Sequence, residues 1–217
     1  MPDTDPVNLT IMRALLGAER QFVSGSHLAR ELGVSRVSIW TRMEQLRSQG
    51  FEFEAATRKG YRIIKKPKDL NALLTRSYLT EQSSCPRLVF LNAIDSTNDH
   101  ATRLLANDYE APFIVISNQQ TLGRGRMGRT WYSPPSSNLY MSLGSRPYVR
   151  PDRMQLFTLW MGVNVARHLK EGLHLEIGLK WPNDLYFDGK KLGGMLTEAR
   201  VDTDYLRELI FGIGLNV

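Results

Sequence analysis

Hydrophobic residues in the first fifty positions recur at helical spacing in three short runs. The first run extends from Leu9 to Leu16, and Gly17 interrupts it. The second run follows Ser26, the expected N-cap, and ends at Gly33, which suits the left-handed backbone of a tight turn. Ser35 is the expected cap of the third run. A helix, a glycine turn and a second capped helix in this order are typical of a helix-turn-helix.

The third run has two different faces. Ile39, Met43 and Leu46 recur at i, i+4 and i+7 and are expected in the core. The opposite face is polar, as a helix that enters the major groove of DNA would require. With the cap residue, the candidate DNA contacts of this helix are Ser35, Arg36, Ser38, Thr41 and Arg42. Trp40 fits neither face, and packs against either the following hairpin or the next domain.

The segment FEFEAATRKGYRII alternates apolar and polar residues on both sides of Arg58-Lys59-Gly60. This pattern predicts a β-hairpin wing with a basic tip, and Arg58 and Lys59 become further candidate DNA contacts. Residues 1–66 hold eleven Lys or Arg against seven Asp or Glu, an excess of +4 out of +6 for the whole chain. Such asymmetry favours nucleic acid as a partner. The alternative is a small helical interaction module whose arginines are only solvated.

The pattern changes at residues 65–69, where Lys and Pro residues interrupt the strand. We therefore expect a DNA-binding domain over residues 1–66, a linker over 67–80 and a second domain over 81–217. In the second domain, RLVFLNAI, FIVIS, LYMSLGSR and LRELIFGIGLNV are predicted strands and DSTNDHATRLLA a capped helix. A long helix is expected from Pro151 to Leu169, followed by two strands around an Asp188-Gly189 turn. With one flanking helix layer, the predicted fold is α+β with a mixed, largely antiparallel sheet.

Composition excludes several classes of protein. A hydrophobic content of 42% and a charged content of 23% are ordinary for a folded soluble chain. No run of about 18 apolar residues occurs, and the acidic start MPDTDPVNLT differs from a secretory signal, so we expect a cytoplasmic protein without a membrane partner. The single cysteine excludes an intramolecular disulfide, and the four histidines lack the spacing of zinc ligands. We expect no protein-built metal site.

Glycine and arginine alternate in GRGRMGR, residues 123–129. The glycines allow close backbone approach to an anion, and guanidinium groups suit carboxylate and phosphate. The glycines are Gly123, Gly125 and Gly128, and the arginines are Arg124, Arg126 and Arg129. Phosphate is the expected ligand, although such a loop taken alone could also contact nucleic acid.

The segment KWPND places Lys180 at the end of an apolar strand. There an ammonium group could meet an acyl oxygen and an α-phosphate together. A single lysine of this kind is more often a solvated surface group. Beside the arginine-glycine loop and the DSTN turn, Lys180 becomes a catalytic candidate.

Five motifs together resemble those of biotin-protein ligases, in order and at similar spacing. They are DSTN (95–98), QTLGRGRMGRTW (120–131), SSNLYMS, KWPNDLYFDGKKLGGML (180–196) and the terminal GIGLN (212–216). With the helix-turn-helix in front, nearly the whole chain resembles the family of bifunctional biotin ligases and biotin-operon repressors. The resemblance implies a catalytic domain like that of class II aminoacyl-tRNA synthetases. The combination GRGRxGRxW and KWPND is far more specific than either motif.

The resemblance also implies roles for individual residues. Lys180, Arg124 and Arg126 would be catalytic. Biotin would be bound by Ser96, Thr97, Asn98, Gln120, Arg124, Gly125, Arg126, Lys180, Gly212 and Gly214. The adenylate would lie near Arg126, Arg129, Trp131 and Asn216.

The implied reaction joins biotin and ATP into biotinyl-5′-AMP, with Mg²⁺ shielding the phosphates. The biotinyl group then passes to a lysine of a biotin carboxyl carrier protein. Biotinyl-5′-AMP would also be the corepressor, and would support a homodimer that binds a palindromic operator DNA.

Two alternatives remain open. Members of this family continue beyond the GIGLN strand with further ATP and carrier contacts and a small C-terminal domain. If the polypeptide ends at Val217, part of those contacts is missing and the strand edge after GIGLN would be left unpaired. A biotin-sensing DNA-binding regulator without catalysis is therefore the second hypothesis. Lipoate or octanoate transfer is the third, because those enzymes share the fold, although GRGRxGRxW favours biotin.

Overall fold

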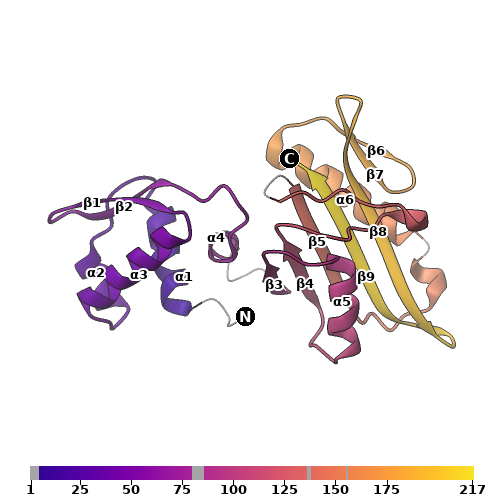
Figure 1. The fold of residues 1–217 in the computed structure, drawn as a ribbon, viewed down its shortest axis with the longest axis horizontal. Helices are drawn as coiled ribbons and strands as arrows, with labels where there is room; N and C mark the ends of the chain where they lie inside the picture. The colour runs from indigo at the N-terminus through magenta and orange to yellow at the C-terminus, as the bar shows by residue number, and fades with distance from the viewer. Residues whose placement is uncertain (1–4, 80–85, 136–137, 155) are drawn as a thin grey trace. The chain divides into compact units, whose positions relative to one another are not determined.

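The computed structural model describes residues 5–79, 86–135, 138–154 and 156–217 (Figure 1). The chain forms two compact units, Met1–Cys85 and Pro86–Val217, and each is described by itself. The predicted start of the second domain at residue 81 lies outside the described residues. No described helix is long and apolar enough to cross a membrane.

The first unit is a winged helix-turn-helix, as predicted. Its elements are α1 (Pro6–Gly17), α2 (Gly25–Glu31), α3 (Arg36–Ser48), β1 (Glu52–Ala56), β2 (Gly60–Lys65) and α4 (Ala72–Tyr78). Gly33 has a φ of +65° in the turn between α2 and α3. The Ser35 hydroxyl accepts a hydrogen bond from the Ser38 amide at 3.0 Å, so Ser35 caps α3.

The predicted cap of α2 was wrong by two residues. The Ser24 hydroxyl, not that of Ser26, accepts from the His27 amide at 3.3 Å. The preceding Val23 pairs with Tyr61 of β2 through two backbone hydrogen bonds, which keeps the chain extended up to Ser24. The helix therefore starts immediately after this pairing, and Ser26 lies in its first turn.

One core holds the first unit together. Ile39, Met43 and Leu46 are almost completely buried there, as their spacing predicted. Leu73 of α4 is buried in the same core. The range 67–80, predicted as a linker, therefore contains a helix of the first unit, because the apolar face of α4 packs on α1.

Glycine is required at the base of the wing. Gly60 has a φ of +109°, and a Cβ atom built on it would lie 2.0 Å from the Val23 carbonyl oxygen. This close approach lets Val23 form an isolated β-bridge with Tyr61 of β2. The turn between β1 and β2 carries Arg58 and Lys59, so the predicted basic tip is confirmed.

The second unit is an α+β domain built on one seven-stranded sheet (Figure 1). Its strands are β3 (Arg87–Leu91), β4 (Phe113–Ser117), β5 (Asn138–Ser145), β6 (Ile177–Lys180), β7 (Asp184–Phe187), β8 (Lys190–Asp202) and β9 (Tyr205–Asn216). Its helices are α5 (Thr97–Ala106), α6 (Phe157–Leu173) and the short 3-10 helices η1 (Arg126–Gly128) and η2 (Pro151–Met154).

The sheet order is β3-β4-β5-β9-β8-β7-β6. Only β3 and β4 are parallel, and the other neighbours are antiparallel, which confirms the mixed, largely antiparallel sheet. The GIGLN segment belongs to β9, which lies between β5 and β8. The expectation of an unpaired edge there was therefore wrong.

Helices cover both faces of this sheet, not one. Alternate residues of β9 point to opposite faces. Ile210 packs with α5 residues Ala101 and Leu105, whereas Phe211 and Ile213 pack in the cluster that includes α6. The sheet is thus a middle layer between α5 and α6.

Two further predictions need correction in this unit. Pro151 begins η2, and the long helix α6 runs from Phe157 to Leu173. The segment predicted as two strands contains three, because residues 181–183 turn the chain between β6 and β7. The Asp188-Gly189 turn joins β7 to β8, and both residues have positive φ, as such a hairpin turn requires.

Candidate functional site

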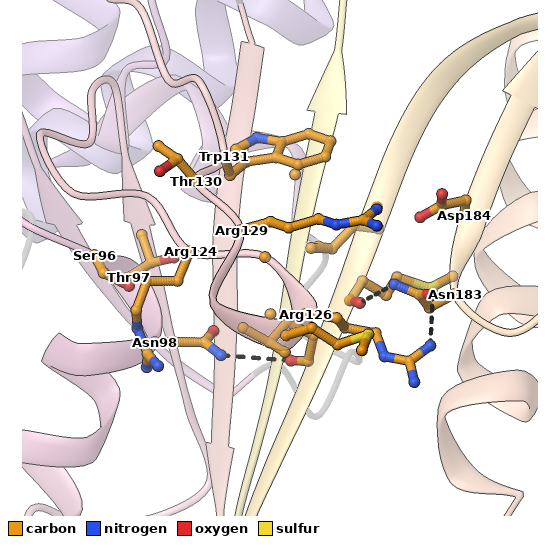
Figure 2. Close-up of a pocket in the computed structure, with 18 of the residues that line it drawn as sticks. Ser96, Thr97, Asn98, Arg124, Arg126, Arg129, Thr130, Trp131, Asn183 and Asp184 are labelled. Carbon is orange, nitrogen blue, oxygen red and sulfur yellow. Dashed lines mark hydrogen bonds between the residues drawn. The ribbon is translucent and has the colours of Figure 1, made fainter.

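A cavity of about 420 Å³ lies on the α5 face of the sheet. Figure 2 shows its walls: the start of α5, the arginine-glycine loop, and the turn between β6 and β7. Glycines of β8 and β9 form its floor. The loop and Lys180 line the same cavity, so the sequence-predicted groups converge.

Almost every predicted site residue of this domain lines the cavity. These are Ser96, Thr97, Asn98, Gln120, Arg124, Gly125, Arg126, Arg129, Trp131, Lys180, Gly212 and Gly214. Asn216 is not among the lining residues. It lies at the end of β9, and its side-chain amide donates to the Lys191 carbonyl oxygen at 3.0 Å, so it ties β9 to β8.

The arginine-glycine loop is a tight hairpin. The Gly125 amide donates to the Arg129 carbonyl at 2.7 Å, and the Trp131 amide donates to the Gly123 carbonyl at 2.8 Å. Of the three loop glycines, only Gly128 has a positive φ. Gly123 is required for another reason, since a Cβ atom there would lie 2.4 Å from the Trp131 carbonyl oxygen.

The three arginines of the loop have different partners. Arg124 forms ion pairs with Asp99 at 2.5 Å and Glu198 at 3.0 Å. Burial disfavours its charge, but the two carboxylates outweigh burial and raise the pKa of Arg124. Arg126 donates to the Asn183 side-chain oxygen at 3.0 Å. Arg129 extends across the cavity (Figure 2) and makes no side-chain hydrogen bond or ion pair with the described residues.

A buried hydrogen-bond network surrounds Asn98, which is 4% exposed. Its side-chain oxygen accepts from the Ser142 hydroxyl at 2.6 Å. Its amide nitrogen donates to Glu198 at 2.6 Å and to the Leu196 carbonyl at 3.4 Å. A Cβ atom on Gly212 would lie 2.1 Å from the Asn98 oxygen, so Gly212 makes room for this amide. The geometry therefore favours Asn98 as a support of the site, whereas its predicted contact with biotin remains a prediction.

Gln120 links the α5 start to the loop. Its side-chain oxygen accepts from the Thr97 amide at 2.8 Å and the Thr97 hydroxyl at 3.0 Å. Its side-chain nitrogen donates to the Ser133 hydroxyl at 2.9 Å, which leaves the second N–H for a ligand. Ser96 caps α5 through a hydrogen bond from the Asp99 amide at 3.3 Å. Its buried hydroxyl lines the cavity.

Trp131 covers part of the glycine floor. Cβ atoms on Gly194 and Gly214 would lie 2.9 Å and 2.6 Å from its indole ring. The indole N–H is buried and has no hydrogen-bond partner among the described residues. A planar ligand above Gly214 must therefore stack beside this ring or displace it.

Sequence analysis missed Lys191, Asn183 and Asp184 as lining residues. Lys191 forms an ion pair with Asp184 at 2.8 Å and lies 5.3 Å from the centre of the Trp131 ring. All three belong to the motif that contains Lys180, but their direction depends on the pairing of β7 with β8, where a bulge shifts the register. That irregularity has no signal in the sequence.

Positive charge dominates the cavity. Of the described residues, five cationic ones line it against one carboxylate, Asp184. The cationic residues are Arg124, Arg126, Arg129, Lys180 and Lys191. Lys180 is exposed, with its ammonium group 5.1 Å from the centre of the Tyr186 ring, and forms no ion pair with a described residue. Such a site suits a ligand with more than one negative group. No group of three or more His, Cys, Asp or Glu within the described ranges is arranged to hold a metal ion.

Some predicted DNA-contact residues of the first unit are free to bind a partner, and others are hydrogen-bonded within the protein. Arg36 and Arg58 line a hollow between α3 and the β1–β2 hairpin, together with Trp40. Trp40 therefore faces the hairpin. Lys59 lies beside them at the hairpin turn, 5.8 Å from the centre of the Phe22 ring.

Three of the other candidates on α3 have side-chain partners within the protein, whereas the Ser38 hydroxyl has none among the described residues. Ser35 caps the helix by accepting from Ser38, and the Thr41 hydroxyl donates to the Val37 carbonyl at 3.1 Å. Arg42 donates to Asp5 at 2.5 Å and to Asn8 at 2.7 Å. Arg42 thus fastens α3 to the start of α1.

Comparisons with known proteins agree with this two-part organisation. The profile of the "Biotin/lipoate A/B protein ligase family" matches residues 90–216, and an "HTH domain" profile matches residues 8–62. The chain is 38% identical over 200 residues to the "Bifunctional ligase/repressor BirA" of Bacillus subtilis, covering 92% of this chain and 62% of that protein. It is 32% identical over 200 residues to the Escherichia coli protein of the same name, covering 92% and 61%.

A solved structure is similar as well. The biotin protein ligase from Leishmania major, in complex with biotinyl-5-AMP, has a TM-score of 0.52 and 36% identity and covers 61% of this chain and 57% of that one. This chain therefore spans about three fifths of the length of its curated bacterial relatives. The family match extends over most of the second unit and includes the cavity. The chain belongs to the biotin/lipoate A/B protein ligase family and carries an N-terminal HTH domain.

Proposed function

We propose that the second unit joins biotin to ATP and transfers the biotinyl group to a lysine of a biotin carboxyl carrier protein. One observation carries the proposal: the arginine-glycine loop, Lys180 and Lys191 line one cavity with a polar wall and a glycine floor. Family membership and the names of the bacterial relatives support the same activity.

In the first step, a carboxylate oxygen of biotin attacks the α-phosphorus of ATP, and pyrophosphate leaves. Both reactants are anions, so their approach is unfavourable unless fixed positive charge offsets the repulsion. Lys180, Lys191 and Arg126 would supply that charge, with Arg129 free to follow the phosphates. Mg²⁺, which binds mainly through nucleotide phosphates in such sites, would neutralise the leaving pyrophosphate.

In the second step, the ε-amine of the carrier lysine attacks the biotinyl carbonyl carbon, and AMP leaves. The mixed anhydride must be protected from water until then. The hairpin loop and the Trp131 ring would cover it. Ser96, Thr97 and Gln120 would hold the polar end of biotin, because one N–H of Gln120 and the Ser96 hydroxyl have bonding capacity left.

We also propose that the first unit binds operator DNA and represses transcription. The basic hairpin tip and Arg36 beside it support DNA binding. The repressor part of the relatives' names supports regulation. A homodimer stabilised by biotinyl-5′-AMP would let two such units span a palindromic site.

Incubation of the 217-residue chain with biotin, ATP, Mg²⁺ and an acceptor carrier domain tests the proposed enzyme. We expect covalent biotin on the acceptor and release of AMP. Biotin binding without transfer would contradict catalysis and favour the second candidate, a biotin-sensing regulator. Transfer of lipoate in preference to biotin would contradict the substrate assignment.

A further inference from the structure

The outward face of α3 is less polar than its sequence suggests. Val37 is 71% exposed and Trp40 is 56% exposed. Both line the hollow between α3 and the β1–β2 hairpin. Adjacent large apolar side chains on a polar surface mark a contact site.

Hydrogen-bonding groups on this face are partly used within the protein. The Thr41 hydroxyl donates to the Val37 carbonyl, the Ser35 hydroxyl caps the helix, and Arg42 is held by α1. In the first two turns of α3, the side chains left for a partner are therefore Arg36, the apolar pair Val37 and Trp40, and Ser38. Ser38 is half-buried and does not line the hollow.

Charge around the hollow identifies the partner. Arg36 and Arg58 line it and are exposed. Among the residues that the structure describes, no Asp or Glu lines it. A cationic rim around an apolar centre fits duplex DNA, in which phosphates surround the groove. Within the major groove, the apolar group presented by a base is the 5-methyl group of thymine.

We propose that Val37 and Trp40 read thymine 5-methyl groups in the major groove, while Arg36 and Arg58 bind the surrounding phosphates or bases. This inference rests on the proposed DNA binding of the first unit. It adds that apolar contacts with thymine methyl groups, and not only hydrogen bonds, determine which DNA sequence is preferred.

Replacement of thymine by uracil tests the proposal, because it removes the methyl group and retains every hydrogen-bonding group. A bound duplex is first selected from a random pool with the full chain, biotin and ATP. Each thymine of the selected site is then replaced singly. We expect at least one replacement per half-site to weaken binding by about three- to tenfold, the order of effect of losing one buried methyl group.

Variants assign the effect to the two side chains. Val37→Ala or Trp40→Ala should weaken binding to the thymine duplex and make the uracil replacement nearly neutral, because the methyl contact is already lost. Ile64→Ala is the matched control, since Ile64 is 62% exposed on β2 outside the hollow. It should retain the full effect of uracil.

Failure of this inference can be distinguished from failure of the proposed DNA binding. Salt-dependent binding of a selected duplex that no uracil replacement weakens would overturn the inference and leave DNA binding intact. An unchanged uracil effect in both the Val37 and Trp40 variants would overturn it too. Absence of any duplex binding would reject the proposed DNA-binding function, and the inference with it.

Discussion

Asn98 and Arg124 line the cavity, yet both already make side-chain hydrogen bonds within the protein. Both donate to the same oxygen of Glu198. Glu198 does not line the cavity, and no motif analysis singled it out. Because it fixes one residue on each of two walls, we expect Glu198 to act as a positioning residue for the ligand site.

Glu198→Ala should lower stability and weaken biotin binding together. The substitution leaves the buried Asn98 amide with only the longer hydrogen bond to the Leu196 carbonyl, a loss of about 1–3 kcal/mol in the free energy of unfolding. It also frees Arg124 to turn toward Asp99 alone. Glu198→Gln keeps an amide oxygen for one donor and should recover part of both losses. Urea denaturation and titration calorimetry with biotin measure the two effects.

Glu176→Gln is the control for the lost charge, because Glu176 is exposed and Lys170 is its one ion-pair partner in the described part of the chain. It should leave both properties unchanged. Wild-type biotin affinity in Glu198→Ala would show that the network has no positioning role.

Arg42 and Arg36 are both on α3, and the structure predicts opposite phenotypes for them. Arg42 is tied to Asp5 and Asn8, so Arg42→Ala should lower the free energy of unfolding by about 1 kcal/mol with little direct loss of a DNA contact. Arg36 is exposed and forms no side-chain hydrogen bond or ion pair with a described residue, so Arg36→Ala should reduce DNA affinity and spare stability. Urea titrations and a duplex-binding assay separate the two.

The stability defect of Arg42→Ala should depend on pH. The hydrogen bond from Arg42 lowers the pKa of Asp5 below its ordinary 3.8 in the folded state. A lowered carboxylate pKa adds stability above the unfolded value and loses it as pH falls through the folded value. The difference between wild type and variant should therefore shrink below about pH 4. A difference that grows in acid would contradict this assignment.

The sequence predicted the site residues correctly where a motif itself contains the charged side chains of the site. GRGRMGR and Lys180 were found as charge-bearing groups, and they share a cavity. Prediction failed where a partner distant in the sequence occupies the side chain. Arg42, predicted to contact DNA, is bound to Asp5, which lies 37 positions away. Lys191 was missed because its direction depends on the register of β8 against β7.

At the scale of elements, periodicity predicted the core-facing helices and the central strands, because burial on one face leaves a regular pattern. It predicted the start of α2 and of α6 less well. The α2 start is set by the pairing of Val23 with Tyr61, and sequence propensity does not contain that long-range contact. The placement of helices on both faces of the sheet also depends on topology. The sequence of β9 does not indicate which of its two faces α5 covers and which α6 covers.

Gly212→Ala tests how strand β9 accommodates the site. The new Cβ atom would lie 2.1 Å from the Asn98 oxygen, and Asn98 is held by three partners and cannot move freely. We expect a loss of about 1–3 kcal/mol in the free energy of unfolding, together with weaker biotin binding. Thermal unfolding and calorimetry measure both.

Gly178→Ala is the matched control on β6, because the nearest atom to its Cβ would be at 3.9 Å. It should be nearly neutral. If Gly212→Ala were equally neutral, the packing of Asn98 on β9 would be wrong.

At the scale of the whole molecule, the chain joins two units with separate cores and separate candidate sites. The first carries a basic hairpin beside an apolar helix face, and the second carries a cationic cavity. Variants of the first site should leave biotin chemistry intact. The central claim concerns the second: fixed positive charge in one cavity brings a carboxylate to a phosphate.

Biotin-dependent exchange of labelled pyrophosphate into ATP measures that step directly. Lys191→Ala should reduce the exchange by about 100-fold or more, as should Lys180→Ala, since each removes a fixed positive charge at the reacting groups. Lys190→Ala removes the same charge one residue away, outside the cavity lining, and should retain near wild-type exchange. Undiminished exchange in both Lys180→Ala and Lys191→Ala would contradict the account.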